Sequence, residues 1–205
     1  LELTGASGAS LTRGPYLQMG TPTSMTIRWR TDVSTNSRVT YGPDSASPIW
    51  SVDDPTSTTE HQVTISNLAP DSKYYYAVGS TSMQLAGGDA TYAFTTSPLP
   101  GTSRPTRVWV LGDSGTGDAN AAAVRDGYSA FTGSRATDLW LMLGDNAYNS
   151  GTDTEYQRGV FDVYPAMLRR SVLWPTFGNH DGGSADSATL TGPYYDMFTL
   201  PRGAE

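Results

Sequence analysis

Three glycines in the second half of the chain are each followed by a side chain that can bind a metal ion through oxygen. Each pair comes directly after an apolar run of the kind that forms a buried strand, and glycine there permits a sharp turn. The pairs are Gly112-Asp113, Gly144-Asp145 and Gly178-Asn179. One such pair is a common turn, but three in one short segment favour a shared site. We therefore expect the three side chains to converge at one edge of a sheet.

The donor atoms of this expected site decide its chemistry. The sequence contains no cysteine, so a metal site must use oxygen and nitrogen ligands. Hard oxygen donors suit Fe(III), Mn, Mg or Zn, and one carboxylate can bridge two ions. Two ions about 4 Å apart can activate a water and clamp the leaving oxygen of a phosphate ester. These residues thus indicate metal-dependent hydrolysis of a phosphate ester.

The elements that must position these residues alternate between strand and helix. Apolar runs cover 108–111, 139–143 and 172–177. Between them, apolar residues recur at helical spacing, with Asp118 as the N-cap of the first helix and Thr152-Asp-Thr-Glu155 as a capping box before the second. Pro165 is expected to break or kink that second helix. The alternation predicts an α/β layer with buried parallel strands.

The first half of the chain has a different period. Met25, Ile27 and Trp29 alternate with polar residues, which predicts a half-buried strand, and similar short runs follow at regular spacing. This pattern predicts a β-sandwich. The stretch around Tyr74 resembles the corner of fibronectin type III domains, in which a Tyr hydroxyl ties down a loop. His61 falls on the same strand face as apolar residues, so we interpret it as a packed histidine rather than a ligand.

The predicted organisation is multi-domain, with an all-β fibronectin-like sandwich followed by an α/β part. A Pro-, Gly- and Ser-rich stretch marks the linker between the two. The predicted boundaries are a flexible arm at 1–11, the sandwich at 12–97, the linker at 98–105 and the α/β part at 106–205.

The three glycine-containing segments, extended by a few residues, resemble the first three motifs of purple acid phosphatases, which belong to the calcineurin-like metallophosphoesterases. The segments are Gly112-Asp-Ser-Gly115, Gly144-Asp-Asn-Ala-Tyr148 and Gly178-Asn-His-Asp181. The resemblance covers nearly the whole chain, because bacterial and plant members carry a fibronectin-like domain ahead of the catalytic one. It implies that residues 106–205 form the N-terminal half of an α/β metallophosphoesterase sandwich.

The resemblance implies a role for each matching residue. Asp113 and the phenolate of Tyr148 would bind the first metal, Asp145 would bridge the two metals, and Asn179 would bind the second through its amide oxygen. His180 would meet the substrate phosphate as hydrogen-bond donor or leaving-group acid. Asp181 would orient His180.

The resemblance also bears on the metals. Most calcineurin-like enzymes place His two residues after the first Asp, where this chain has Gly115. The phenolate of Tyr148 would compensate and favours Fe(III), and a ferric phenolate absorbs visible light. The implied cofactor is a dinuclear centre of Fe(III) plus a divalent ion, which is Fe, Zn or Mn.

The sequence departs from the family in one respect. Later motifs of the family contribute three histidine ligands, whereas this chain has two histidines in total and neither fits those roles. We therefore expect the N-terminal part of a longer enzyme, with weak metal binding by this part alone. The expected partner of this N-terminal part is then the missing C-terminal half of the same enzyme. The aromatic residues between 194 and 200 are expected to pack on something absent.

Composition and the resemblance also bear on the partners of the protein and on its compartment. The net charge of -7 and the lack of a basic run argue against binding to nucleic acid. The sequence contains no run of about 18 apolar residues, so it predicts no membrane span. The resemblance implies a secreted or periplasmic enzyme whose signal peptide is removed or not included.

Four functions remain open at this stage. The expected substrate is a phosphate monoester, hydrolysed by an acid phosphatase, and a phosphodiesterase of the same superfamily is the near alternative. An inactive fragment or a binding module would have no need for the site residues together. The fourth possible function is nucleotide binding, but the loop Gly112–Gly117 lacks both common phosphate-binding patterns.

Overall fold

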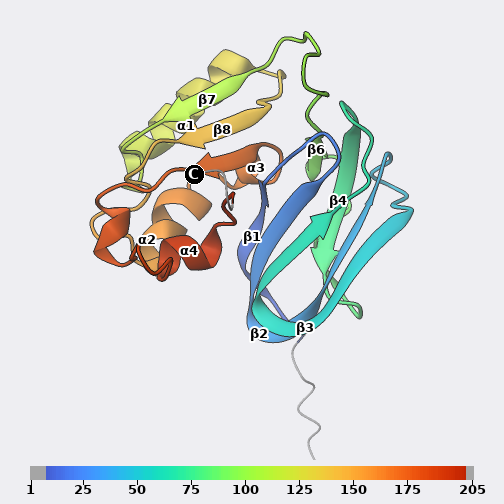
Figure 1. The fold of residues 1–205 in the computed structure, drawn as a ribbon, viewed down its shortest axis with the longest axis horizontal. Coiled ribbons are helices and arrows are strands. Elements are labelled where there is room, and N and C mark those ends of the chain that lie inside the picture. The colour runs from blue at the N-terminus through green and yellow to red at the C-terminus, as the bar shows by residue number, and fades with distance from the viewer. Residues whose placement is uncertain (1–7, 202–205) are drawn as a thin grey trace, which may run out of the picture.

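The computed structural model describes residues 8–201, and its N-terminal part is a fibronectin-like β-sandwich (Figure 1). The predicted strands are present, although two of the expected runs belong to one long strand, β2, which passes from one layer to the other through register shifts after Arg30. Residues 1–7 of the predicted arm lie outside the described residues, and Leu11 already belongs to β1. The strands are β1 (Leu11–Gln18), β2 (Met25–Gly42), β3 (Trp50–Ile65), β4 (Lys73–Gly79), β5 (Gln84–Gly87) and β6 (Ala93–Thr95).

The core of the sandwich confirms the predicted corner and the interpretation of its histidine. The backbone N–H of Ala69 donates to the Tyr74 hydroxyl at 2.9 Å, which is the loop-fixing bond expected of a tyrosine corner. His61 is fully buried, stacks on Trp29 with 4.8 Å between ring centroids, and hydrogen-bonds the hydroxyls of Thr31 and Ser37. Both ring nitrogens therefore have partners, and His61 is a packed residue.

The first half of β2 is buried on both faces, not on one face as its period-two pattern predicts. Thr26 and Arg28, on the polar face, are as well buried as Ile27. The Arg28 guanidinium donates to the backbone carbonyl of Asp196 at 2.5 Å and to the Thr199 hydroxyl at 3.3 Å. The second face of β2 is thus covered at Arg28 by the segment 196–199, which belongs to the α/β part.

The α/β part extends the same sheet instead of forming a separate one. Strands β7, β8 and β9 are parallel in the order β9-β8-β7, and β1 pairs with β9 at Leu17 and Val172. In Figure 1 this layer lies to the left of the sandwich, with α2 and α4 below it. The elements are β7 (Val108–Leu111), α1 (Ala119–Thr132), β8 (Leu139–Met142), α2 (Asp153–Tyr156), the π-helix η1 (Gln157–Phe161), α3 (Pro165–Leu168), β9 (Val172–Pro175), the 3₁₀ helix η2 (Asp181–Gly183) and α4 (Pro193–Met197).

The helix starts are those that the sequence predicts. The Asp118 carboxylate accepts from the N–H groups of Asn120 and Ala121 at the start of α1, and the capping box of Thr152 and Glu155 opens α2. Pro165 does break the second helical segment, and it starts α3 at the position where its missing N–H costs nothing. On α1, Ala121 is buried, whereas Val124 and Phe131 are exposed.

The aromatic residues between 194 and 200 pack on the chain itself, so the expectation that they await an absent partner is wrong. Tyr194, Met197 and Phe198 are buried in the α/β core. The Tyr16 hydroxyl donates to the Met197 carbonyl at 2.6 Å, and the ring of Phe198 lies 5.7 Å from that of Tyr156. The segment closes the junction between β1 and the helices.

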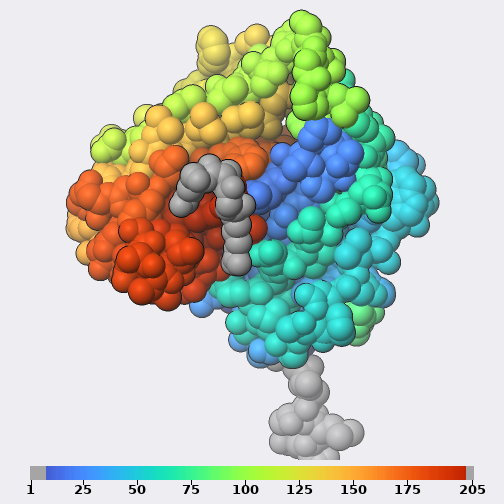
Figure 2. Space-filling model, in the orientation of Figure 1, coloured from blue at the N-terminus to red at the C-terminus, as the bar shows by residue number. Residues whose placement is uncertain are grey.

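Within residues 8–201, helices cover one face of the parallel strands and leave the other open. On the covered face Trp109 and Trp140 are buried, whereas on the other face Val108 and Val110 are 42% and 50% exposed. Figure 2 shows β7 and β8 at the surface with no layer over them. A parallel sheet is normally buried on both faces, so this face is unusual. Among residues 8–201, no helix is long and apolar enough to cross a membrane.

Candidate functional site

The three predicted loops leave the carboxyl ends of β7, β8 and β9 and lie against one another. The N–H of Asp113 donates to the Gly144 carbonyl at 3.2 Å, and the N–H of Gly115 donates to the Asp145 carbonyl at 3.2 Å. The N–H of His180 donates to the Asp145 carboxylate at 3.1 Å. Neighbouring parallel strands end at one edge of the sheet, so residues far apart in sequence meet there.

Three of the predicted site residues converge on one point. The Tyr148 hydroxyl lies 3.1 Å from Oδ1 of Asp113 and 3.2 Å from Oδ2 of Asp145. Asp113 and Asp145 have φ angles of +54° and +52°, a left-handed conformation that is unfavourable for residues other than glycine. Aspartate tolerates this conformation better than most residues, and at both positions it turns the chain sharply after the strand.

The two carboxylates are not neutralised by a basic side chain. Within residues 8–201, no Lys or Arg forms an ion pair with Asp113 or Asp145, and the nearest basic atom is Nε2 of His180, 4.0 Å from Asp145. Burial, together with the hydrogen bonds to both carboxylates, raises the pKa of the Tyr148 hydroxyl far above its usual value. A cation placed among these oxygens would stabilise both carboxylates and favour the phenolate.

Of the remaining predicted residues, His180 lies beside this point. Asn179 is exposed on the loop after β9, one residue before His180. Nδ1 of His180 donates to the Asn149 carbonyl at 2.7 Å, which leaves Nε2 on the side of Asp145. The sequence predicts that Asp181 orients His180, but the Asp181 carboxylate is buried and has other partners. The carbonyl of Asn149 orients the imidazole instead.

The donor set fits part of a metal site and not a whole one. Asp113, Asp145 and Tyr148 supply oxygen atoms of the kind that hard cations prefer, already brought together. Within the described part of the chain, however, no group of three or more His, Cys, Asp or Glu side chains could hold a metal ion. Further ligands are needed to complete the coordination.

The sequence interpretation missed four residues that shape the site. The backbone N–H of Asn146 and the Tyr156 hydroxyl both donate to the Asp181 carboxylate, Glu155 accepts from the loop after Tyr148, and Arg158 donates to the Tyr148 carbonyl at 2.9 Å. Glu155 has a sequence signal, because it belongs to the capping box. Arg158 and Tyr156 have none, since their roles depend on which loop folds over them.

The absence of a side chain at position 115 has a steric cause. A Cβ added to Gly115 would lie 2.3 Å from the carbonyl carbon of Asn146, a contact that requires the backbone to move. We expect Gly115→Ala to lower the free energy of unfolding by about 1–3 kcal/mol, measured by urea denaturation. Gly127→Ala is the matched control. Its Cβ would meet nothing within 4 Å, and it lies inside α1, so we expect it to stabilise by about 0.5–1 kcal/mol. Equal stability of Gly115→Ala and the wild type would contradict this close approach.

Glu155 makes the site region sensitive to acid. Its carboxylate accepts from the N–H groups of Thr152, Ser150 and Asn149, and these bonds lower its pKa from 4.5 to about 2. Because the pKa is lowered in the folded state, its contribution to stability is complete above the unfolded-state value and is lost as pH falls toward 2.

We therefore expect the unfolding free energy of the wild type to fall as the pH is lowered from about 5 to about 2, and to fall less in Glu155→Gln. Urea denaturation at a series of pH values measures both slopes. Asp126→Asn removes an exposed carboxylate elsewhere and serves as control. A slope for Glu155→Gln equal to that of the wild type would show that these bonds contribute nothing.

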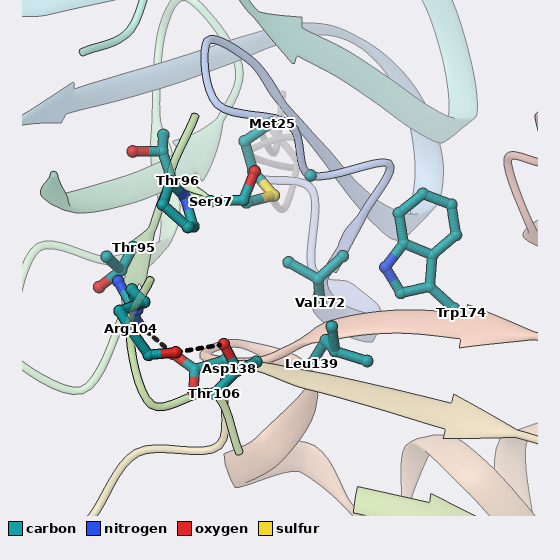
Figure 3. Close-up of a pocket in the computed structure, with 12 residues that line it drawn as sticks. Met25, Thr95, Thr96, Ser97, Arg104, Thr106, Asp138, Leu139, Val172 and Trp174 are labelled. Carbon is teal, nitrogen blue, oxygen red and sulfur yellow. Dashed lines mark hydrogen bonds and ion pairs between the residues drawn. The ribbon is translucent and has the colours of Figure 1, made fainter. Parts of the chain in front are cut away.

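A small cavity lies apart from this site. It has a volume of about 80 Å³ and lies between the sandwich and the parallel sheet. Figure 3 shows Met25 and Thr96 on one side, Val172 and Leu139 on the other, and the ion pair of Arg104 with Asp138 below. Leu139 and Val172 begin their strands, whereas the candidate site follows the strand ends, so the cavity contains none of the site residues.

Comparisons with known proteins identify the N-terminal part of the chain. Residues 13–96 match the family model "Purple acid Phosphatase, N-terminal domain". The chain is 31% identical over 134 residues to Purple acid phosphatase 1 of Ipomoea batatas, and 23% identical over 163 residues to Probable inactive purple acid phosphatase 1 of Arabidopsis thaliana. These matches cover 62% and 69% of this chain and 26% of each relative, so the chain spans about a quarter of their length.

A solved structure described as "Structure of PhoD" shares the fold. The two are 14% identical with a TM-score of 0.66, and the match covers 93% of this chain and 46% of the PhoD chain. At this identity the match speaks for the fold alone. The sequence matches are specific to one family. Residues 13–96 thus form a purple acid phosphatase N-terminal domain, and the chain is partially homologous to the purple acid phosphatases of plants.

Proposed function

We propose that this chain is the carboxylate-bearing part of a metal-dependent acid phosphatase that hydrolyses phosphate monoesters at a dinuclear metal centre. The observation that carries the proposal is the pair of carboxylates, Asp113 and Asp145, held at left-handed φ angles around the Tyr148 hydroxyl with no Lys or Arg paired to either within residues 8–201. Unneutralised carboxylates at strand ends are typical of a cation site.

The proposed centre is Fe(III) with a divalent ion, which is Fe, Zn or Mn. Asp113 and Tyr148 would hold the first ion, Asp145 would bridge, and Asn179 would contribute to the second. The ions would supply the positive charge that hydrolysis of a phosphate ester requires. The hard oxygen donors of Asp113, Asp145 and Tyr148, with both carboxylates within hydrogen-bond distance of the Tyr148 hydroxyl, support this assignment.

His180 is the residue that we assign to the substrate. Because a carbonyl can only accept, its Nδ1 carries the proton that is donated to Asn149. The other nitrogen, Nε2, is then directed toward the carboxylates, and the imidazolium form can donate from it to a phosphate oxygen or a leaving group. The ring of Tyr148 lies 4.4 Å from the imidazole and limits its rotation.

The remaining ligands would come from a downstream half of the same enzyme, which we also propose as the layer that covers the exposed sheet face. This face is apolar at Val108, Val110 and Leu143, and it adjoins the strand ends that carry the candidate site. A downstream half that packs there would bring its own side chains to the same edge. Coverage of only a quarter of the plant relatives supports the proposal.

The test is a hydrolysis assay on a polypeptide that contains these 205 residues followed by a downstream half. We expect metal-dependent turnover of p-nitrophenyl phosphate at acid pH and much weaker turnover of bis(p-nitrophenyl) phosphate. Preference for the diester would favour the phosphodiesterase alternative. No turnover of either ester in protein loaded with iron and zinc would favour an inactive member of the family. One of the relatives is itself named as probably inactive.

A further inference from the structure

The carboxylate of Asp181 lies at the centre of a buried set of hydrogen-bond donors beneath the candidate site. Asp181 is fully buried at the start of η2. It accepts from the N–H of Gly178 at 2.9 Å, from the side-chain amide of Asn146 at 3.0 Å, from the N–H of Asn146 at 3.2 and 3.3 Å, and from the Tyr156 hydroxyl. Every one of these groups donates, as is required around an ionised carboxylate.

These partners connect the loops that carry the predicted ligands. Asn146 directly follows Asp145 on the loop after β8, and Gly178 directly precedes Asn179 on the loop after β9. The same two loops are joined a second time on the outer side, where the N–H of His180 donates to Asp145. Asp181 therefore holds these two loops together beneath the site. The relative position of the loops determines the direction in which the Asp145 carboxylate points.

The loops are packed too closely to adjust independently. A Cβ added to Gly178 would lie 2.2 Å from the backbone nitrogen of Asp145 and 2.4 Å from its Oδ1. A displacement of one loop must therefore move the other. Bonds to a buried carboxylate are short and strong, and leaving such a group without its donors is costly, so this set of bonds resists displacement.

We propose that Asp181 is a positioning residue for Asp145 and His180, and that the Tyr156 hydroxyl holds Asp181 in place from α2. The proposal rests on the function proposed above, in that it treats Asp145 as a metal ligand. Asp181 acts through the two loop backbones and has no contact with the imidazole. The sequence pattern places Asp181 beside His180, but the fold turns the carboxylate toward the core.

The experiment compares Tyr156→Phe and Asp181→Asn with Tyr74→Phe in the full chain. Tyr156→Phe and Tyr74→Phe each remove one hydrogen-bonded tyrosine hydroxyl, the first from a buried bond beneath the site and the second from a partly buried bond in the sandwich. The first readout is hydrogen exchange of the His180 amide, followed by NMR without metal, because this amide touches neither Asp181 nor Tyr156. The second readout is the Mn²⁺ affinity of each variant in a polypeptide that also carries the downstream half.

We expect exchange of the His180 amide to become roughly tenfold faster in Tyr156→Phe and in Asp181→Asn, and Mn²⁺ affinity to fall about 10–100-fold, as it does when residues supporting metal ligands are changed. Tyr74→Phe should change neither. If Asp181→Asn does not fold, Tyr156→Phe carries the test alone.

The outcomes separate the two proposals. Unchanged His180 exchange in Tyr156→Phe, or an equal increase in Tyr74→Phe, overturns the positioning role, since the effect would then be absent or merely global. Faster exchange confined to the two site variants supports it. If this occurs while the polypeptide that also carries the downstream half binds no Mn²⁺, the positioning of the loops stands and the proposed function fails.

Discussion

Replacing Asp145 with asparagine is expected to lower the turnover of p-nitrophenyl phosphate by about 10²-fold or more. Changing residues that merely support metal ligands costs about 10–100-fold, and the loss of a bridging ligand should exceed that range. The asparagine side chain keeps the size of the carboxylate, so the loop after β8 has no steric reason to move. The assay uses the polypeptide with its downstream half, and metal content is measured in parallel.

Stability separates this effect from simple unfolding. In the absence of metal, Asp145 and Asp113 repel each other across the Tyr148 hydroxyl, so removal of one charge is expected to leave stability unchanged or to raise it. Asp118→Asn is the matched control. It makes the same substitution in the first loop, and asparagine caps a helix as well as aspartate does. Turnover by Asp145→Asn at the level of Asp118→Asn would remove Asp145 from the proposed centre.

Replacing Arg13 with alanine is expected to lower the free energy of unfolding by about 2–4 kcal/mol, because a buried side chain loses its hydrogen bonds and leaves a cavity. The side chain of Arg13 is fully buried between the sandwich and α2. Its Nη2 lies 2.8 Å from Asp153, its Nε donates to Gln157 at 3.1 Å, and its guanidinium lies 4.3 Å from the ring centre of Phe161. The change removes all of these contacts and leaves a cavity.

Arg30 supplies the control within the same cluster. It also binds Asp153, at 2.7 Å, and Glu60, at 3.3 Å, but its side chain is 36% exposed. Because water solvates the charges of an exposed ion pair, the pair contributes little to stability. Arg30→Ala should therefore lower the free energy of unfolding by no more than about 1 kcal/mol. Urea denaturation of both variants gives the difference directly. Equal losses for the two would show that burial of Arg13 adds nothing to the junction.

The strands and the strand-end loops could be predicted from the sequence because local patterns specify them. The apolar run at 139–143 ends in Gly144 and Asp145, and the structure places β8 and its loop there. The convergence of Asp113 with Asp145 follows from parallel neighbouring strands, which is a general property of such sheets. The tyrosine corner at Tyr74 was predictable for the same reason, since it depends on residues close in sequence.

What the sequence could not supply depends on contacts between distant segments. Arg28 alternates with apolar residues as an exposed residue would, yet it is buried because the segment around Asp196 folds over it. Asp181 follows His180 directly, and only the packing of α2 shows that its carboxylate is turned inward to Tyr156. In both cases a polar side chain is buried by a tertiary contact that leaves no periodic signal.

The pairing of β1 with β9 affects how the protein folds during synthesis and whether its two parts can be separated. Because β1 occupies the edge of β9, a chain that began after the linker would present the open edge of a parallel sheet, and such edges recruit other strands and aggregate. During synthesis the N-terminal sandwich is complete before β9 leaves the ribosome, so it offers a ready template for that strand. The sandwich is therefore an assembly partner of the α/β part and not an exchangeable module.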